Sequence, residues 1–190
     1  MPRIPQRRVA ERARPRPKTP ATPPLTKARQ ATPRSSAKDP LWGPLLSGKH
    51  SLGALHNLTP MARIDLVRDG IPAEAVSVVA EDMRIAREKL YATLGLARAT
   101  IERKLRLGQR LDPDQGERVM GMLRLIGQVH EIVRESGDPT DFSAARWVAS
   151  WLNRPLPALG GREPATLMDT AEGREIVAGL IAQTQSAAYA

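Results

Sequence analysis

Apolar residues recur at helical spacing from residue 60 onward, and no segment shows convincing two-residue alternation of apolar and polar residues, the period of a strand. A first short helix is predicted over residues 61–68, and Gly70 is suited to end it. Pro72 suits the opening of a second helix, because proline fits the first helical turn. The pattern therefore predicts an all-α chain.

Two further helices, over residues 87–94 and 97–107, have the spacing of a helix-turn-helix. Gly95 would lie at the tight turn, and Leu96 and Ile101 would fix the second helix against the core. Five side chains of this second helix would face outward as candidates for DNA contact: Arg98, Thr100, Arg103, Lys104 and Arg106. The first two lie near the helix start and are candidates for reading base edges, whereas the other three would hold phosphates.

Tyr91 stands four residues before Gly95, where helix-turn-helix families usually have a small residue that lets the two helices approach. Either the helices cross differently here, or this region keeps the fold without strong DNA binding. A plain helical hairpin with solvated arginines is the alternative to a DNA-binding surface.

A long helix is predicted from Pro113 to about Glu135, where Asp112 can cap the start and Gly137 and Pro139 end the pattern. Its apolar residues occupy more than one stripe, so the helix must be covered on two sides. We expect a central spine that packs against the chain's own helices or, alternatively, in part against a second subunit.

A tryptophan-bearing helix is expected to open at Asp141 and to stop before Pro155 and Pro157, which forbid its continuation. Gly160 and Gly161, which follow, can adopt positive φ. Pro164 suits a first helical position, and Thr170 can cap the last helix. The sequence therefore predicts a helix, a loop and a last helix.

The basic charge is concentrated in the first 40 residues. They hold 11 Lys and Arg against two acidic residues, a net charge of +9 that equals the net charge of the whole chain. Rich in proline and poor in apolar residues, this tail is expected to be disordered. Its arginines could contact nucleic acid, although a solvated tail is the preferred interpretation. Trp42 and several leucines before Thr59 can dock on the folded part.

Catalysis needs convergent reactive groups, and the sequence offers few. The chain has no cysteine, and its three histidines, His50, His56 and His130, lack the i, i+4 spacing of a helical zinc site. No apolar run approaches the roughly 20 residues that span a bilayer. These features predict a soluble cytoplasmic protein that is not an enzyme, with no catalytic residue, metal or cofactor and no membrane partner.

The segment from residue 153 to residue 174 carries prolines, paired glycines and arginines at fixed offsets. The residues of this string are Asn153, Pro155, Pro157, Ala158, Leu159, Gly160, Gly161, Arg162, Pro164, Asp169, Thr170, Gly173 and Arg174. The string resembles the C-terminal toxin-binding domain of the Xre/MbcA/ParS antitoxins, a family that partners RES-domain toxins. An ordinary interhelical turn would not account for the whole string.

The resemblance covers roughly the last third of the chain, and the middle third fits the family's helix-turn-helix region. It implies an Xre-like helix-turn-helix region over residues 60–135 and a toxin-binding domain over 136–190, after the tail and linker over 1–59, whose composition predicts disorder. It also implies an antitoxin of a type II toxin–antitoxin system, whose C-terminal end bars NAD from the active site of a NAD-consuming RES-domain toxin.

On this resemblance, the candidate toxin-binding residues are Gly160, Gly161, Arg162, Pro164, Thr170, Gly173, Arg174, Tyr189 and Ala190. Arg162 could pair with a toxin carboxylate or cap its own neighbouring helix. Family members are generally dimeric, and a dimer would place two recognition helices on a palindromic operator. We therefore expect a homodimer that represses its own operon. The alternatives are a stand-alone helix-turn-helix transcriptional regulator and a degenerate family member that binds toxin but not DNA.

Overall fold

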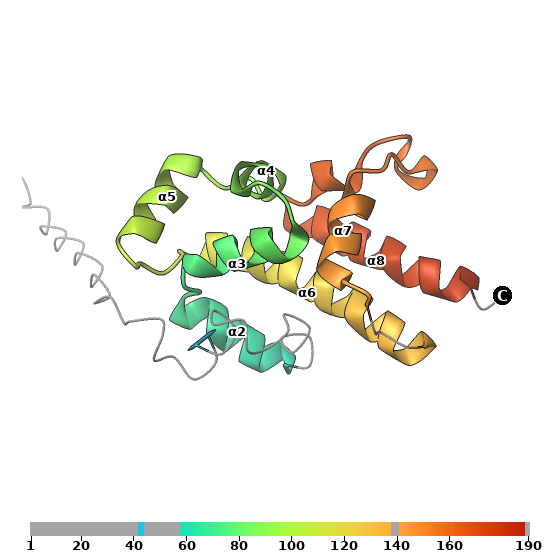
Figure 1. Ribbon diagram of the computed structural model, residues 1–190, viewed down its shortest axis with the longest axis horizontal. Helices are drawn as coiled ribbons and strands as arrows, with labels where there is room; N and C mark the ends of the chain where they lie inside the picture. The colour runs from blue at the N-terminus through green and yellow to red at the C-terminus, as the bar shows by residue number, and fades with distance from the viewer. Residues whose placement is uncertain (1–41, 44–57, 138–140, 189–190) are drawn as a thin grey trace, which may run out of the picture. The chain divides into compact units, whose positions relative to one another are not determined.

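Local sequence signals set the helix boundaries in the computed structural model, which describes residues 42–43, 58–137 and 141–188, with side chains as far as residue 184. The described helices, in chain order, are α2 (Pro60–Asp69), α3 (Glu74–Met83), α4 (Arg87–Thr93), α5 (Arg98–Arg106), α6 (Pro113–Ser136), α7 (Ala144–Leu152) and α8 (Ala171–Ala188). Two short 3-10 helices, Pro157–Leu159 and Pro164–Leu167, lie between α7 and α8. These residues contain no strand, so the predicted all-α class is confirmed (Figure 1).

The basic tail lies outside the described residues, and so does most of the linker. Trp42 is the exception, because its side chain is 1% exposed and belongs to the core. The expectation that this tryptophan docks on the folded part is confirmed. None of the described helices is long and apolar enough to cross a membrane.

Helix α2 begins and ends close to the predicted positions, and α3 begins close to the predicted opening at Pro72. The hydroxyl of Thr59 accepts a hydrogen bond from the Ala62 amide (3.2 Å), and Gly70 ends α2 with a φ of 87°. Helix α3 begins two residues after Pro72, whose carbonyl accepts a hydrogen bond from the Ala75 amide (3.1 Å). The proline therefore opens the turn that leads into α3.

Helix α6 is the spine of the fold (Figure 1). Asp112 caps its start, and the Gln115 side chain bonds back to the Asp112 amide (3.2 Å), which makes a capping box. Its apolar stripes are buried against the chain's own helices: α2, α3, α7 and α8. Intramolecular packing thus accounts for the buried stripes of this helix.

Helix α7 does not open at Asp141. That residue has a left-handed φ of 68°, which cannot start a right-handed helix. The helix starts at Ala144, and the Ser143 hydroxyl accepts a hydrogen bond from the Arg146 amide (3.3 Å) as its cap. The rings of Trp147 and Trp151 stack with centroids 5.9 Å apart, and Trp151 is buried in the core.

Helix α8 packs along α6, and the Gln128 amide nitrogen donates to the Ala178 carbonyl (3.0 Å) across this contact. Val177 and Ile181 belong to the same core as Leu90 and Ile101 of the helix-turn-helix region. The last helices and the helix-turn-helix helices therefore share one hydrophobic core.

Candidate functional site

The turn between α4 and α5 is tight and requires glycine. Gly95 has a φ of 61°, and the Leu96 amide donates to the Tyr91 carbonyl (2.8 Å). A Cβ at Gly95 would lie 2.7 Å from a guanidinium nitrogen of Arg118 and 3.0 Å from the Cβ of Asp169. The predicted role of this glycine is confirmed, and contacts from distant parts of the chain add to it.

Arg118 of α6 holds this turn in place. Its guanidinium donates to the carbonyls of Leu94 (3.2 Å) and Gly95 (3.0 Å) and lies 3.1 Å from a carboxylate oxygen of Asp114. The sequence interpretation missed this arginine as a positioning residue. Its i, i+4 spacing from Asp114 was visible, but its contact with the turn depends on how α6 packs.

The large side chain of Tyr91 is buried in the core. Its ring is 2% exposed, and its hydroxyl donates to a carboxylate oxygen of Glu102 on α5 (3.0 Å). Burial raises the pKa of Tyr91 to about 12, and the hydrogen bond to Glu102 adds to this shift. The large residue therefore links α4 to α5 by a hydrogen bond.

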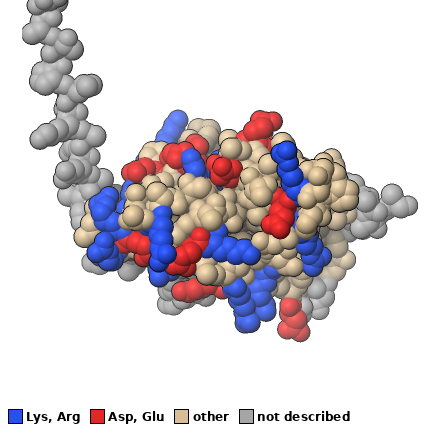
Figure 2. Space-filling view, turned by 90° about the horizontal axis from the view of Figure 1, so that it is seen from above, with Lys and Arg blue, Asp and Glu red and all other residues tan. Residues whose placement is uncertain are grey.

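All three predicted DNA-binding arginines are exposed on α5: Arg98, Arg103 and Arg106. Thr100 is half-buried. Arg98 lies 3.3 Å from a Glu88 carboxylate oxygen, and Arg103 donates to the Gln109 side chain (3.2 Å). Figure 2 views the molecule from above Figure 1, and basic and acidic side chains are interspersed on the face it shows.

The prediction that Lys104 faces outward is wrong. The side chain is buried, and its ammonium donates to the Arg110 carbonyl (3.0 Å) and to a carboxylate oxygen of Asp112 (2.8 Å). The chain reverses at Gly108, whose φ is 56°, and brings Asp112 back over the end of α5. The lysine therefore joins α5 to α6 and is not placed to contact a phosphate.

The loop between α7 and α8 presents Gly160, Gly161 and Arg162 on the surface. The two glycines have φ values of 64° and 81°, and a Cβ at either would meet no atom within 4 Å. Backbone bonds between Leu156 and Arg162 close the loop, with the Leu156 amide 3.1 Å from the Arg162 carbonyl. Within the part of the chain that the structure describes, the Arg162 guanidinium neither caps a helix nor pairs with a carboxylate.

Four other candidate toxin-binding residues have contacts within the chain itself. Pro164 is buried at the start of a 3-10 helix, and the Thr170 hydroxyl caps α8 by accepting from the Gly173 amide (3.0 Å). A Cβ at Gly173 would overlap the Leu167 carbonyl oxygen, so only glycine fits there. These contacts confirm Thr170 as the cap of α8 and Pro164 as a first helical residue.

Arg174 crosses from α8 to α6. Its side chain lies directly over Gly121, where a Cβ would overlap it, and its guanidinium donates to the Met168 carbonyl (3.2 Å). Burial lowers the pKa of Arg174, and the nearby Arg118 lowers it further. Tyr189 and Ala190, the last two candidates, lie outside the described residues. The described residues also contain no group of three or more His, Asp or Glu placed to hold a metal.

Comparison with known proteins finds two matching domain families along the chain. Residues 62–124 match the family described as the antitoxin Xre-like helix-turn-helix domain, and residues 140–186 match the antitoxin Xre/MbcA/ParS C-terminal toxin-binding domain. A curated protein of Sphingobium sp. (strain YBL2), the "Prs ADP-ribosylating antitoxin", is 37% identical over 137 residues, which cover 72% of this chain and 86% of that protein. The chain therefore belongs to the Xre/MbcA/ParS family of antitoxins, with an Xre-like helix-turn-helix domain and a C-terminal toxin-binding domain.

Proposed function

We propose that this antitoxin neutralises a NAD-consuming RES-domain toxin by placing the end of α8 in the toxin's substrate pocket. The observation that carries the proposal is the way α8 leaves the core. Ile181 is its last buried residue among those with described side chains, whereas residues 182–184 are exposed and the helix continues to Ala188 (Figure 1). A helix that extends beyond its own core can enter a cavity of a partner.

The exposed loop supplies the second part of the proposed interface. Gly160 and Gly161 leave open space for a partner's backbone. The Arg162 guanidinium, which has no partner among the described residues, can pair with a toxin carboxylate. Four other candidates would support toxin binding indirectly, because their contacts fix the start of α8: Pro164, Thr170, Gly173 and Arg174. Tyr189 and Ala190 would reach furthest into the pocket.

The name of the curated relative supports the choice of toxin chemistry. That protein is called an ADP-ribosylating antitoxin, and ADP-ribosylation consumes NAD. We infer that the toxin paired with this chain transfers ADP-ribose to a target, rather than only hydrolysing NAD.

Co-expression tests the proposal directly. The chain, tagged at its N-terminus, is expressed with the neighbouring reading frame if that frame encodes a RES-domain protein. The proposal expects growth arrest with the neighbour alone, rescue with both proteins and a stable complex on pull-down. An Arg162→Glu variant should weaken the complex, and Arg146→Glu, an exposed arginine of α7, serves as the matched control. Absence of toxicity and of a complex would contradict the proposal.

We further propose that the antitoxin binds its own operator as a homodimer and represses its operon. The exposed Arg98, Arg103 and Arg106 on α5 support this role, because a recognition helix reads DNA with its outward side chains. Helices α2 to α6 would form the DNA-binding region over residues 60–135, and residues 136–190 would form the toxin-binding region.

The operator proposal predicts that Arg103→Glu/Arg106→Glu lowers operator affinity and reduces its salt dependence, while toxin binding stays unchanged. Lys104 is unsuited to this test, because its substitution would break the contact between α5 and α6. Unchanged operator affinity in the double variant would contradict the role proposed for α5, whereas a wild-type chain without operator affinity would favour the family member that binds toxin but not DNA.

A further inference from the structure

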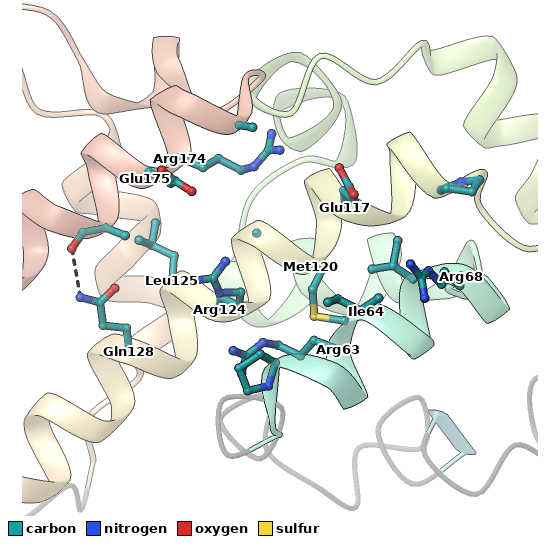
Figure 3. Close-up of a pocket in the computed structure, with 16 residues that line it drawn as sticks. Arg63, Ile64, Arg68, Glu117, Met120, Arg124, Leu125, Gln128, Arg174 and Glu175 are labelled. Carbon is teal, nitrogen blue, oxygen red and sulfur yellow. Dashed lines mark hydrogen bonds between the residues drawn. The ribbon is translucent and has the colours of Figure 1, made fainter.

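A groove of about 890 Å³ lies between α2, α6 and α8 (Figure 3). Apolar side chains line much of it, including Ile64, Val67, Met120 and Leu125. Its charged lining residues are Arg63, Arg68, Arg124 and Arg174, against Glu117 and Glu175. The groove therefore combines an apolar lining with an excess of positive charge.

Two arginines of the groove have no hydrogen-bond or ion-pair partner among the described residues. Neither Arg68 nor Arg124 makes a hydrogen bond or ion pair there, and both are exposed. Burial lowers the pKa of Arg63, and the adjacent Arg124 lowers it further. Cations that repel one another around a groove are stabilised by an anionic partner.

The apolar lining favours a protein partner over nucleic acid. Ile64 is 41% exposed, and Met61, on the same helix, is 61% exposed. Phosphates would pair with the arginines but would leave these apolar side chains uncovered.

We propose that the groove receives an amphipathic segment of the partner toxin, whose carboxylates pair with Arg68 and Arg124 and whose apolar side chains cover Ile64. The toxin is the chosen occupant because α8 contributes Ala171, Arg174, Glu175 and Ala178 to the groove and lies in the matched toxin-binding region. This inference rests on the proposed function, and it adds an acidic docking segment to the loop and the end of α8.

The groove is lined by residues from both matched regions of the chain. Its lining residues from Arg63 to Arg124 fall within the matched helix-turn-helix region, whereas its α8 residues fall within the toxin-binding region. A toxin segment seated here would contact both regions of one antitoxin chain.

The test uses the full-length antitoxin, purified cognate RES-domain toxin and the double variant Arg68→Glu/Arg124→Glu. Both arginines are exposed and make no hydrogen bond or ion pair within the described residues, so the thermal unfolding temperature should stay near that of the wild type. The toxin affinity should fall by about tenfold or more, because each reversal replaces an attraction with a repulsion. The control is Lys89→Glu/Arg146→Glu, which makes the same change in net charge at exposed positions of α4 and α7 that do not line the groove.

The control should bind toxin within about twofold of the wild type, since it alters only the long-range field. Equal affinities of the two double variants would overturn the inference. A change in the molar mass of the antitoxin alone, measured by light scattering, would assign the groove to a second copy. Loss of operator affinity with unchanged toxin affinity would assign it to nucleic acid. A wild-type chain that fails to bind the toxin would overturn the proposed function itself, whereas a tight wild-type complex unaffected by Arg68→Glu/Arg124→Glu would overturn only the groove.

Discussion

Lys104 is the residue on which the joint between α5 and α6 depends. Its ammonium is shared between the Arg110 carbonyl and the Asp112 carboxylate, and the side chain is 5% exposed. Asp112 also caps α6, so a single carboxylate serves both helices. A buried ammonium is tolerated here because it has both a carboxylate and a carbonyl as acceptors.

Replacing Lys104 with methionine should destabilise the fold by about 1–3 kcal/mol, because the Arg110 carbonyl loses its donor. Chemical denaturation gives the free energy of unfolding. Arg103→Met, an exposed change on the same helix, is the control and should stay within about 0.5 kcal/mol of the wild type. Equal stabilities of the two variants would contradict the role assigned to Lys104.

Tyr91 should show its environment in a titration. Because folding raises the pKa of Tyr91 to about 12, above the ordinary value of about 10, folding favours the protonated phenol. Its contribution to stability is therefore complete below about pH 10 and is lost as the pH rises through about 12.

The chain has two tyrosines, so Tyr189→Phe leaves Tyr91 as the only tyrosine chromophore. Absorbance at the phenolate band should then titrate with a midpoint near 12 while the protein is folded. A midpoint at the ordinary value in the folded protein would show that the Tyr91 hydroxyl is neither buried nor bonded to Glu102.

At the scale of elements, the start of α8 is held in place by three specific contacts. Gly173 lies against the Leu167 carbonyl, Thr170 caps the helix, and Arg174 lies over Gly121 of α6. The direction in which α8 leaves the core follows from these contacts.

Gly173→Ala should destabilise the protein by about 1–3 kcal/mol, because the new Cβ would overlap backbone that cannot move aside cheaply. Gly179→Ala is a matched control in the same helix, with no atom within 4 Å of the added Cβ. It should stabilise α8 by about 0.5–1 kcal/mol, since alanine favours helix over glycine. Thermal and chemical unfolding compare the two, and a Gly173→Ala variant as stable as Gly179→Ala would refute the close packing.

The elements could be predicted from sequence where the signal is local. Asp112 as a cap, Gly95 at the turn and Thr170 before α8 are each recognised from a few neighbouring residues. The prediction that α7 starts at Asp141 was wrong, because aspartate is also tolerated at positive φ and the nearby Ser143 is an equally good cap.

What the sequence could not predict depends on tertiary contacts. Lys104 looks like its exposed neighbours Arg103 and Arg106, and only the reversal of the chain at Gly108 brings Asp112 onto it. Similarly, the arginines of the groove come from three helices, and no local motif links them. Family resemblance pointed correctly to the antitoxin, but it did not separate residues that shape α8 from those that face a partner.

At the scale of the whole molecule, the candidate toxin-binding and DNA-binding surfaces lie on helices that share one hydrophobic core. Helix α6 packs against α8 and, through Arg118, holds the turn of the helix-turn-helix region. Toxin bound at α8 and operator bound at α5 would therefore act on neighbouring parts of one core.

The central claim is that the end of α8 blocks the toxin's NAD pocket, and NAD consumption by purified toxin tests it most directly. The assay compares the full chain with a chain that lacks the residues after Gln183, at equal concentrations above the dissociation constant. The truncation removes no residue of the described core, so its unfolding temperature and operator binding should be unchanged. We predict that the full chain abolishes NAD consumption and that the truncated chain does not. Full inhibition by the truncated chain would contradict the account.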